Sequence, residues 1–152
     1  MKLLAKRVKY VEGDVFELRL DENGNIGYGR ILKLDKPSIF VELFELQPSQ
    51  DSKELATIRE FNSLFSVWCT DNGLKNGVWN VIGNIPVIGE VIIPDFWTTD
   101  AFTDKILLVR GEERMEISKE QIGDLLAAGI YGHEAVRLTY IQQLVKKGLY
   151  HK

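Results

Sequence analysis

Hydrophobic and polar residues alternate most regularly near the start of the chain. Phe16, Leu18 and Leu20 are separated by single charged residues, which is the period of a strand with one buried face. Residues 21–25 (DENGN) follow, and Asn and Gly tolerate the positive φ that a hairpin turn needs. The pattern therefore predicts a β-hairpin over residues 13–34.

The hairpin can pair in two registers, and the residues alone leave both open. A two-residue turn at positions 23 and 24 places Leu18 opposite Gly29. A five-residue loop over positions 21–25 places Leu18 opposite Tyr28 and Asp14 diagonal to Arg30. We favour the second register because it keeps one face apolar and brings opposite charges within reach.

Two glycines, Gly27 and Gly29, share one face of the second strand of this hairpin. They leave a bare strip where another backbone can approach or the strand can bulge. A sheet that bends at such a strip can begin to close. We therefore expect a curved antiparallel sheet or a partly closed small β-barrel.

The rest of the chain predicts further strands and, towards its C-terminus, helices. Apolar runs between turn signals predict strands over residues 6–11, 39–46, 64–70, 78–83, 106–110 and 115–117. Residues 50–62 carry apolar side chains spaced as on one helix face, which leaves a short helix or a loop open there.

Two helical patterns occupy the last third of the chain. Ser118 begins SKEQ, a capping box closed by Gln121, and apolar residues follow at helical spacing as far as Gly129. A second run, over residues 133–147, has one apolar face. The expected architecture is one α+β domain over residues 1–152, with a sheet followed by two C-terminal helices.

Composition places the chain among soluble globular proteins. It has 152 residues, of which 45% are hydrophobic and 27% charged. The net charge of −3 and the pI of about 5.5 give no basic field to attract nucleic acid. The single cysteine, Cys69, excludes an internal disulfide and fits a reducing compartment. No apolar run approaches the roughly 20 residues of a membrane span, and no signal-peptide pattern is present, so we expect a cytoplasmic protein with no membrane partner.

Residues that could perform catalysis or bind a metal are sparse. His133 and His151 are far apart, and no Cys-x-x-Cys, His-x-x-x-His or acidic calcium loop occurs. Cys69 lies in an apolar strand, where a thiol usually serves packing. No nucleophile elbow or phosphate-binding loop is found. We therefore predict no catalytic residues, no metal and no cofactor.

Carboxylates are the one chemical group present in quantity. Between positions 71 and 104 the chain has five acidic residues and one basic residue, a net charge of −4. The acidic residues are Asp71, Glu90, Asp95, Asp100 and Asp104. Such a run is either a solvated face or a docking surface for a basic partner. Trp97 lies inside the run and is either a core residue or an interface anchor.

A smaller polar cluster comes from the hairpin itself. Tyr28 and Arg30 lie on one face of the second strand because they are two residues apart. They could line a pocket in which Arg30 binds a carboxylate or a phosphate. The simpler interpretation, which we favour, is a structural ion pair between Arg30 and Asp14.

These residues resemble a known family. Gly13-Asp14-Val15-Phe16 followed by Gly27-Tyr28-Gly29-Arg30 is similar to the N-terminal signature of the immunity protein 26 family of bacterial polymorphic toxin systems. Weaker similarities follow at Trp79-x-x-Ile82-Gly83-x-Ile85-Pro86, at Pro94-x-Phe96 and at Gly129-x-Tyr131-Gly132-x-Glu134-Ala135-Val136. The pattern spans roughly residues 11–147.

The resemblance implies a non-enzymatic inhibitor that binds a cognate toxin, often a nuclease, inside the producing cell. In that interpretation Asp14, Phe16, Tyr28 and Arg30 are a structural signature, and the acidic residues with Trp97 meet a basic surface of the toxin. The main alternative is an SH3-like small-barrel module that binds nucleic acid or a peptide, and the acidic balance disfavours nucleic acid. A hydrolase with a carboxylate pair is a third hypothesis.

Overall fold

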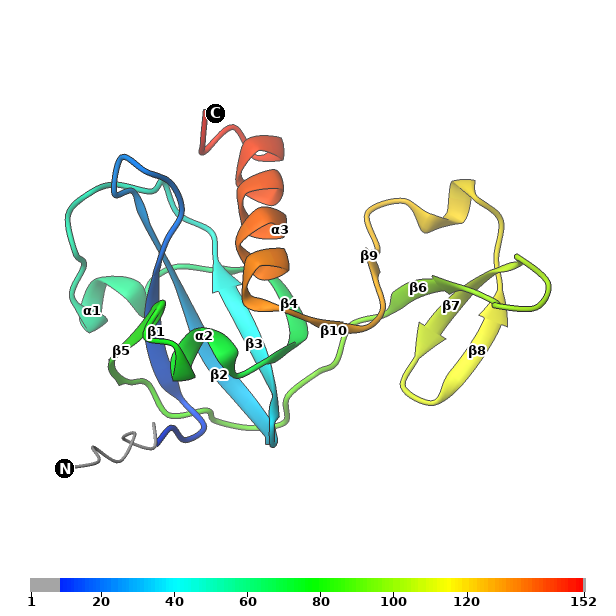
Figure 1. The fold of residues 1–152 in the computed structure, drawn as a ribbon, viewed down its shortest axis with the longest axis horizontal. Coiled ribbons are helices and arrows are strands. Elements are labelled where there is room, and N and C mark those ends of the chain that lie inside the picture. The colour runs from blue at the N-terminus through cyan, green and yellow to red at the C-terminus, as the bar shows by residue number, and fades with distance from the viewer. Residues whose placement is uncertain (1–8, 152) are drawn as a thin grey trace, which may run out of the picture. The chain divides into compact units, whose positions relative to one another are not determined.

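Two separate β-sheets account for most of the regular structure (Figure 1). The computed structural model describes residues 9–151. The strands divide between two units, each with its own sheet. Unit 1 takes in the described residues up to Val91 and those from Ile130 onward, and unit 2 is the segment between them, Ile92–Gly129.

Unit 1 is built on a six-stranded sheet with the strand order β10-β4-β3-β2-β1-β5. Neighbouring strands are antiparallel except β10 and β4, which run parallel. The strands are β1 (Asp14–Arg19), β2 (Ile26–Asp35), β3 (Ser38–Phe44), β4 (Ser63–Thr70), β5 (Trp79–Asn84) and β10 (Ile130–Tyr131).

Helices and buried side chains cover both faces of this sheet. The helix α3 (His133–Lys146) packs on the face of Gly27, where the Tyr140 ring lies (Figure 1). The one-turn helix α2 (Asn72–Lys75) lies against Trp79 on that face, because Gly73 contacts its ring. The opposite face carries a second apolar cluster around Tyr28 and the one-turn helix α1 (Leu55–Ile58).

The β1–β2 hairpin forms in a register that the sequence analysis did not consider. Leu18 faces Gly27, Phe16 faces Gly29, and Tyr28 faces Glu17. The connection is a four-residue loop, closed by a hydrogen bond of 2.8 Å from Leu20 N to the Asn25 carbonyl oxygen. Both predicted registers are therefore wrong, because contacts of the Asp21 carboxylate inside the loop fix its length.

The space at the glycines of β2 is filled by aromatic rings and, at Gly29, also by the Glu42 carbonyl oxygen of β3, which lies 2.8 Å from the position of a Cβ atom. A Cβ atom on Gly29 would lie 2.5 Å from Phe16 Cζ, and one on Gly27 would lie 2.5 Å from Tyr140 Cε2. The six-stranded sheet carries a register shift in β2 between Ile31 and Lys33. It ends at β10 and β5 and is not closed into a barrel.

Unit 2 has a four-stranded sheet with the order β8-β7-β6-β9. Its pairs are antiparallel except β6 with β9, which is parallel. The elements are β6 (Phe96–Thr99), β7 (Ile106–Arg110), β8 (Glu113–Glu116), the 3-10 turn η1 (Glu120–Ile122) and β9 (Leu126–Ala127).

One of the two predicted C-terminal helices is absent. The Ser118 capping box forms, with hydrogen bonds in both directions between Ser118 and Gln121. However, the turn that it begins ends at Gly123, whose φ of +50° is incompatible with a right-handed helix. Leu126, in β9, then pairs with Phe96 of β6. Residues whose spacing predicted a helix therefore form a strand instead. Only α3 forms a C-terminal helix in the described residues.

The other predictions largely hold. The strands predicted from residue 39 onward and the helix over residues 133–147 are confirmed within a few residues. Residues 6–8 of the predicted first strand lie outside the described residues, and residues 9–11 form no strand. The α+β class is confirmed, with two sheets in place of one. The expectation of one domain stays a prediction.

Candidate interaction surfaces

The hairpin and Trp79 segments of the family resemblance meet in unit 1. Phe16 of β1 and Trp79 of β5 stack with ring centroids 4.6 Å apart and planes 9° apart. Both side chains are buried, and Gly29 provides the space beneath the Phe16 ring. Phe16 therefore joins two motif segments in the core.

Arg30 is part of the same junction but pairs with a different acid from the one predicted. Its Nε atom donates to Glu42 Oε2 at 2.8 Å, and its Nη1 atom donates to the Ile85 carbonyl oxygen at 3.1 Å. Asp14 instead accepts hydrogen bonds from Val11 N at 3.0 Å and Asn84 Nδ2 at 2.9 Å. The expected Asp14–Arg30 ion pair does not form, because Glu42 is the direct cross-strand neighbour of Arg30. Arg30 and Asp14 instead each make their own contact at the end of β5.

Tyr28 is fully buried. Its hydroxyl accepts a hydrogen bond of 2.7 Å from Lys53 N, which ties the loop after β3 to the sheet. Tyr140 of α3 reaches the backbone nearby and donates to the Phe44 carbonyl oxygen at 2.6 Å. Burial raises the pKa of both phenols, so both hydroxyls remain protonated near neutral pH. These residues hold elements together and are not placed to meet a ligand.

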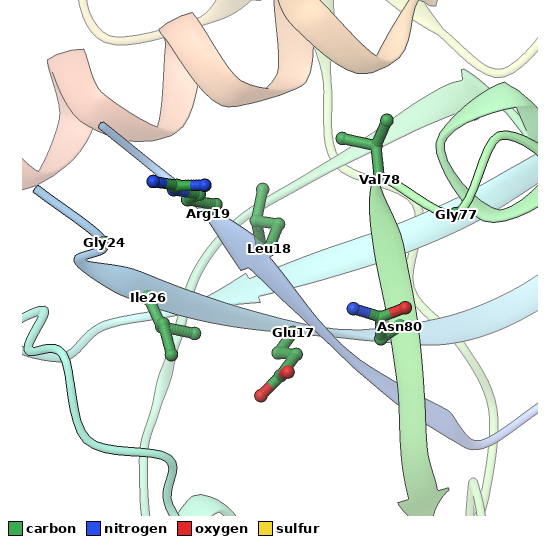
Figure 2. Close-up of a pocket in the computed structure, with 8 residues that line it drawn as sticks. All are labelled: Glu17, Leu18, Arg19, Gly24, Ile26, Gly77, Val78 and Asn80. Atoms are coloured by element: carbon green, nitrogen blue, oxygen red, sulfur yellow. The ribbon is translucent and has the colours of Figure 1, made fainter. Parts of the chain in front are cut away.

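A shallow depression of about 490 Å³ lies at the surface where the hairpin meets the start of β5 (Figure 2). Figure 2 shows Glu17, Leu18 and Arg19 of β1 beside Val78 and Asn80 at the β5 side, with Gly24 and Ile26 from the turn and β2 and Gly77 at the edge. Its walls combine a carboxylate, a guanidinium, an amide and apolar side chains. This mixture can bind a partner, and it provides no nucleophile.

A second depression continues the first, because Arg19 and Val78 line both. It runs between the hairpin turn and α3, where Leu138 is 44% exposed. Arg137 of α3 donates to the Leu20 carbonyl oxygen at 2.7 Å and forms a two-point ion pair with Glu134. We call the two depressions together the hairpin–helix groove.

The turn beside this groove is held by the carboxylate of Asp21. It accepts hydrogen bonds from Asn23 N at 2.9 Å, from Asn25 N at 3.1 Å and from Asn25 Nδ2 at 2.7 Å, and the Tyr150 hydroxyl also donates to it. Burial raises the pKa of Asp21, but these hydrogen bonds outweigh burial and lower it to about 2. Burial and the contact with Asp21 raise the pKa of Tyr150 to about 12. Both groups keep one protonation state near neutral pH.

The described residues offer little chemistry for turnover. Burial raises the pKa of the Cys69 thiol to about 12, so it remains a neutral packing group. Within residues 9–151, no group of three His, Cys, Asp or Glu side chains is placed to hold a metal ion. No helix in that range is both long and apolar enough to cross a membrane.

The predicted acidic docking residues are divided between the two units. Asp71 is only 3% exposed, because it accepts a hydrogen bond of 2.5 Å from the Tyr10 hydroxyl and pairs with Lys75 at 3.2 Å. The structure therefore removes Asp71 from the predicted surface. Glu90 is exposed in unit 1. The remaining residues, Asp95, Trp97, Asp100 and Asp104, all belong to unit 2.

Comparison with known proteins identifies the family of the chain. The family model of immunity protein 26 matches residues 11–105, which is more than half of the chain and includes the hairpin, β5 and β6. The chain belongs to the immunity protein 26 family. No match to it was found among curated proteins or solved structures. The C-terminal motif around Gly132 lies outside the matched residues.

In this immunity protein 26 family member, the acidic residues of unit 2 have distinct roles. Asp95 forms a two-point ion pair with Arg110, at 3.1 and 2.9 Å. Asp100 binds backbone amides within its own turn, whereas Asp104 is exposed. Trp97 is half-buried and has Leu108 as its cross-strand neighbour. Their role in binding a partner stays a prediction.

Sequence reasoning missed the most exposed large apolar side chain of unit 2. Phe102 is 98% exposed and lies in the turn between β6 and β7. In the sequence it is a lone Phe in DAFTDK, outside any strand or helix periodicity, which does not by itself indicate exposure. It carried no weight because exposed single apolar residues are common on protein surfaces.

Proposed function

We propose that this protein binds a cognate bacterial toxin and neutralises it by stoichiometric occlusion, without catalysis. The family match over residues 11–105 carries the proposal. The toxin belongs to a polymorphic toxin system, is often a nuclease, and would act in the cytoplasm of the producing cell unless it were bound. An inhibitor that acts by occlusion needs a stable scaffold and a complementary surface, and it needs no reacting groups.

The separation of the signature residues, which form the scaffold, from the surface residues supports this proposal. Phe16, Tyr28 and Arg30 are occupied by contacts inside unit 1, so the family signature accounts for the scaffold. A surface that recognises one toxin is then free to vary elsewhere without loss of the fold. The groups beside the hairpin–helix groove have pKa values far from neutral, which suits binding better than proton transfer.

Charge indicates the kind of toxin surface that would be bound. Residues 92–129 hold eight acidic and four basic side chains, a net charge of −4, whereas the whole chain carries −3. A basic surface on the toxin would be attracted to this unit and oriented by it. We therefore propose that Asp95, Trp97, Asp100 and Asp104 belong to the docking surface of unit 2. Glu90, in unit 1, stays a separate candidate contact.

Titration of the toxin with this protein tests the proposed function. The probe is the purified C-terminal domain of the toxin encoded beside this chain, assayed at a concentration well above the dissociation constant. We expect activity to fall linearly and reach zero at a molar ratio of one, with a one-to-one complex in light scattering. Inactivation at a ratio far below one would indicate catalytic modification of the toxin. No inhibition at any ratio would contradict the proposal.

A further inference from the structure

The turn between β6 and β7 displays a bare aromatic ring. Phe102 is 98% exposed, the largest exposed fraction among the large hydrophobic side chains of the described residues. It lies beyond the end of β6 at Thr99 and before β7 begins at Ile106. A Phe side chain in this position contributes nothing to the core, and it leaves a large apolar area in contact with water.

Hydrogen bonds hold the backbone of this turn in one conformation. Asp100 Oδ1 accepts from Phe102 N at 2.8 Å and from Thr103 N at 3.1 Å. Asp100 N donates to the Lys105 carbonyl oxygen at 2.8 Å, and Asp104 N donates to the Asp100 carbonyl oxygen at 3.0 Å. The backbone that carries the Phe102 ring is therefore ordered before binding, and little backbone freedom is lost when a partner covers the ring.

The surroundings of the ring are acidic. Asp100 and Asp104 flank it, the one basic residue of the turn, Lys105, forms an ion pair with Glu116, and unit 2 as a whole carries a net charge of −4. The carboxylate of Asp104 forms no ion pair among the described residues, so it is available to a cation from outside. A partner that fits this turn has an apolar pocket for one aromatic ring, and basic side chains around that pocket.

We infer that Phe102 is the apolar anchor of toxin binding, inserted into an apolar pocket at a basic surface of the toxin, with Asp104 at the rim. This inference rests on the proposed function. It names Phe102 as the contact that contributes most of the affinity for the toxin. Aromatic anchors seated in a pocket dominate the energy of many interfaces, and charged residues around them mainly affect the rate of association. Phe102 and Asp104 should therefore have separable effects.

Phe102→Ala tests the anchor, with Ile88→Ala as a matched control. Ile88 is 92% exposed and lies in unit 1, so both substitutions truncate a bare apolar side chain. Binding of each variant to the same toxin domain is measured by surface plasmon resonance. We expect Phe102→Ala to raise Kd about 30-fold or more, mainly through faster dissociation, and Ile88→Ala to change Kd less than threefold. Unaltered circular dichroism and melting of both variants exclude a folding effect.

Asp104→Asn tests the charged rim. Asp104 has a φ of +59°, a conformation that Asn also tolerates, so the substitution removes the charge and keeps the backbone. We expect a several-fold lower association rate at low salt, and a difference that disappears at high salt. Glu12→Gln, at an exposed position in unit 1, removes a carboxylate of the same charge and should leave the rate unchanged.

The outcomes separate this inference from the proposed function. If the wild-type chain inhibits the toxin and Phe102→Ala binds equally well, the anchor is wrong and the function stands. If Leu138→Asp in the hairpin–helix groove abolishes binding while Phe102→Ala does not, the interface lies on unit 1 and the anchor is again wrong. If the wild-type chain neither binds nor inhibits the toxin, both proposals fail.

Discussion

Phe16 and Trp79 stack face to face, with ring centroids 4.6 Å apart and planes 9° apart. The two rings belong to separate motif segments of the immunity protein 26 family, and β1 pairs with β5 directly beneath them. Gly29 and Gly73 complete the arrangement, because a Cβ atom on either would collide with one of the rings. The family pattern thus describes a packing unit of the core.

Truncation of this aromatic pair should reduce the stability of unit 1 and should not act directly on toxin binding. Phe16 is fully buried, so Phe16→Ala should lower the free energy of unfolding by about 3–5 kcal/mol. Val81→Ala on β5 is the control; Val81 is 41% exposed, and its truncation should cost less than about 1 kcal/mol. Urea denaturation followed by circular dichroism measures both values. Equal costs for the two variants would contradict a structural role for the stacked pair.

The ion pair of Arg30 should contribute more stability than an ion pair at the surface. The side chains of Arg30 and Glu42 are 20% and 10% exposed, and Arg30 also binds the Ile85 carbonyl oxygen. Arg30→Ala leaves a largely buried carboxylate without its partner, so we expect a loss of about 3 kcal/mol. Lys105→Ala breaks a pair with Glu116 whose members are 56% and 60% exposed, and it should change the stability by less than about 1 kcal/mol.

Urea denaturation of both variants compares the stability that the two ion pairs contribute. A second variant of Arg30 separates the effect of its charge from the effect of its packing. Arg30→Met keeps much of the side-chain length and removes the guanidinium. If the cost of Arg30→Ala comes from the unpaired Glu42, Arg30→Met should be nearly as destabilising as Arg30→Ala. A Met variant as stable as the wild type would show that packing, and not the ion pair, holds the end of β5.

Acid should weaken the contact between the hairpin turn and the C-terminal segment. The hydrogen bonds to Asp21 lower its pKa from the ordinary value of 3.8 to about 2, against the opposing effect of burial. Because the pKa is lower in the folded state, Asp21 stabilises the fold fully above the ordinary value and loses this contribution as the pH falls towards 2. Tyr150 has a raised pKa of about 12, so its contribution is present below pH 10 and is lost as the pH rises through 12.

Tyr150→Phe provides the test of this linkage. The variant lacks the hydroxyl that donates to Asp21, so the pKa of Asp21 should rise towards its ordinary value. Carboxyl chemical shifts in an NMR titration report that pKa directly. The acid-side loss of stability should still begin near the ordinary pKa, but it should be smaller than in the wild type and complete at a higher pH. An unchanged Asp21 pKa would mean that Asn23 and Asn25 hold the carboxylate without help from Tyr150.

Local pattern was sufficient to predict most strands and the helix α3, because these elements show a clear hydrophobic period. It failed where a distant or specific contact decides the outcome. The hairpin register depends on the hydrogen bonds of Asp21, and the predicted helix after Ser118 stops at Gly123 because Leu126 pairs with β6. The acidic run could be read from the sequence, but the burial of Asp71 against Tyr10 could not.

The sequence drew attention to the acidic residues of unit 2 and not to the aromatic ring among them. Asp100 and Asp104 were singled out for their carboxylates, and Phe102 between them was not. Exposure is a tertiary property, so no pattern in the sequence distinguishes a bare Phe from one that packs under a neighbouring loop. Arg30 illustrates the same limit, since its partner Glu42 is fixed by the β2–β3 register and not by spacing within the hairpin.

The fit between Gly27 and Tyr140 offers the sharpest test of how α3 is attached to the sheet. A Cβ atom on Gly27 would lie 2.5 Å from Tyr140 Cε2, with no backbone atom among its nearest neighbours. Gly27→Ala should therefore destabilise the protein by about 1–3 kcal/mol, because the ring must move. Tyr140→Leu loses the hydrogen bond to the Phe44 carbonyl oxygen and is destabilising by itself, but it empties the space that the new methyl group needs. The double variant should then be more stable than the sum of the single effects by about 1 kcal/mol or more, measured by urea denaturation, whereas strictly additive effects would place the strain in the β2 backbone itself.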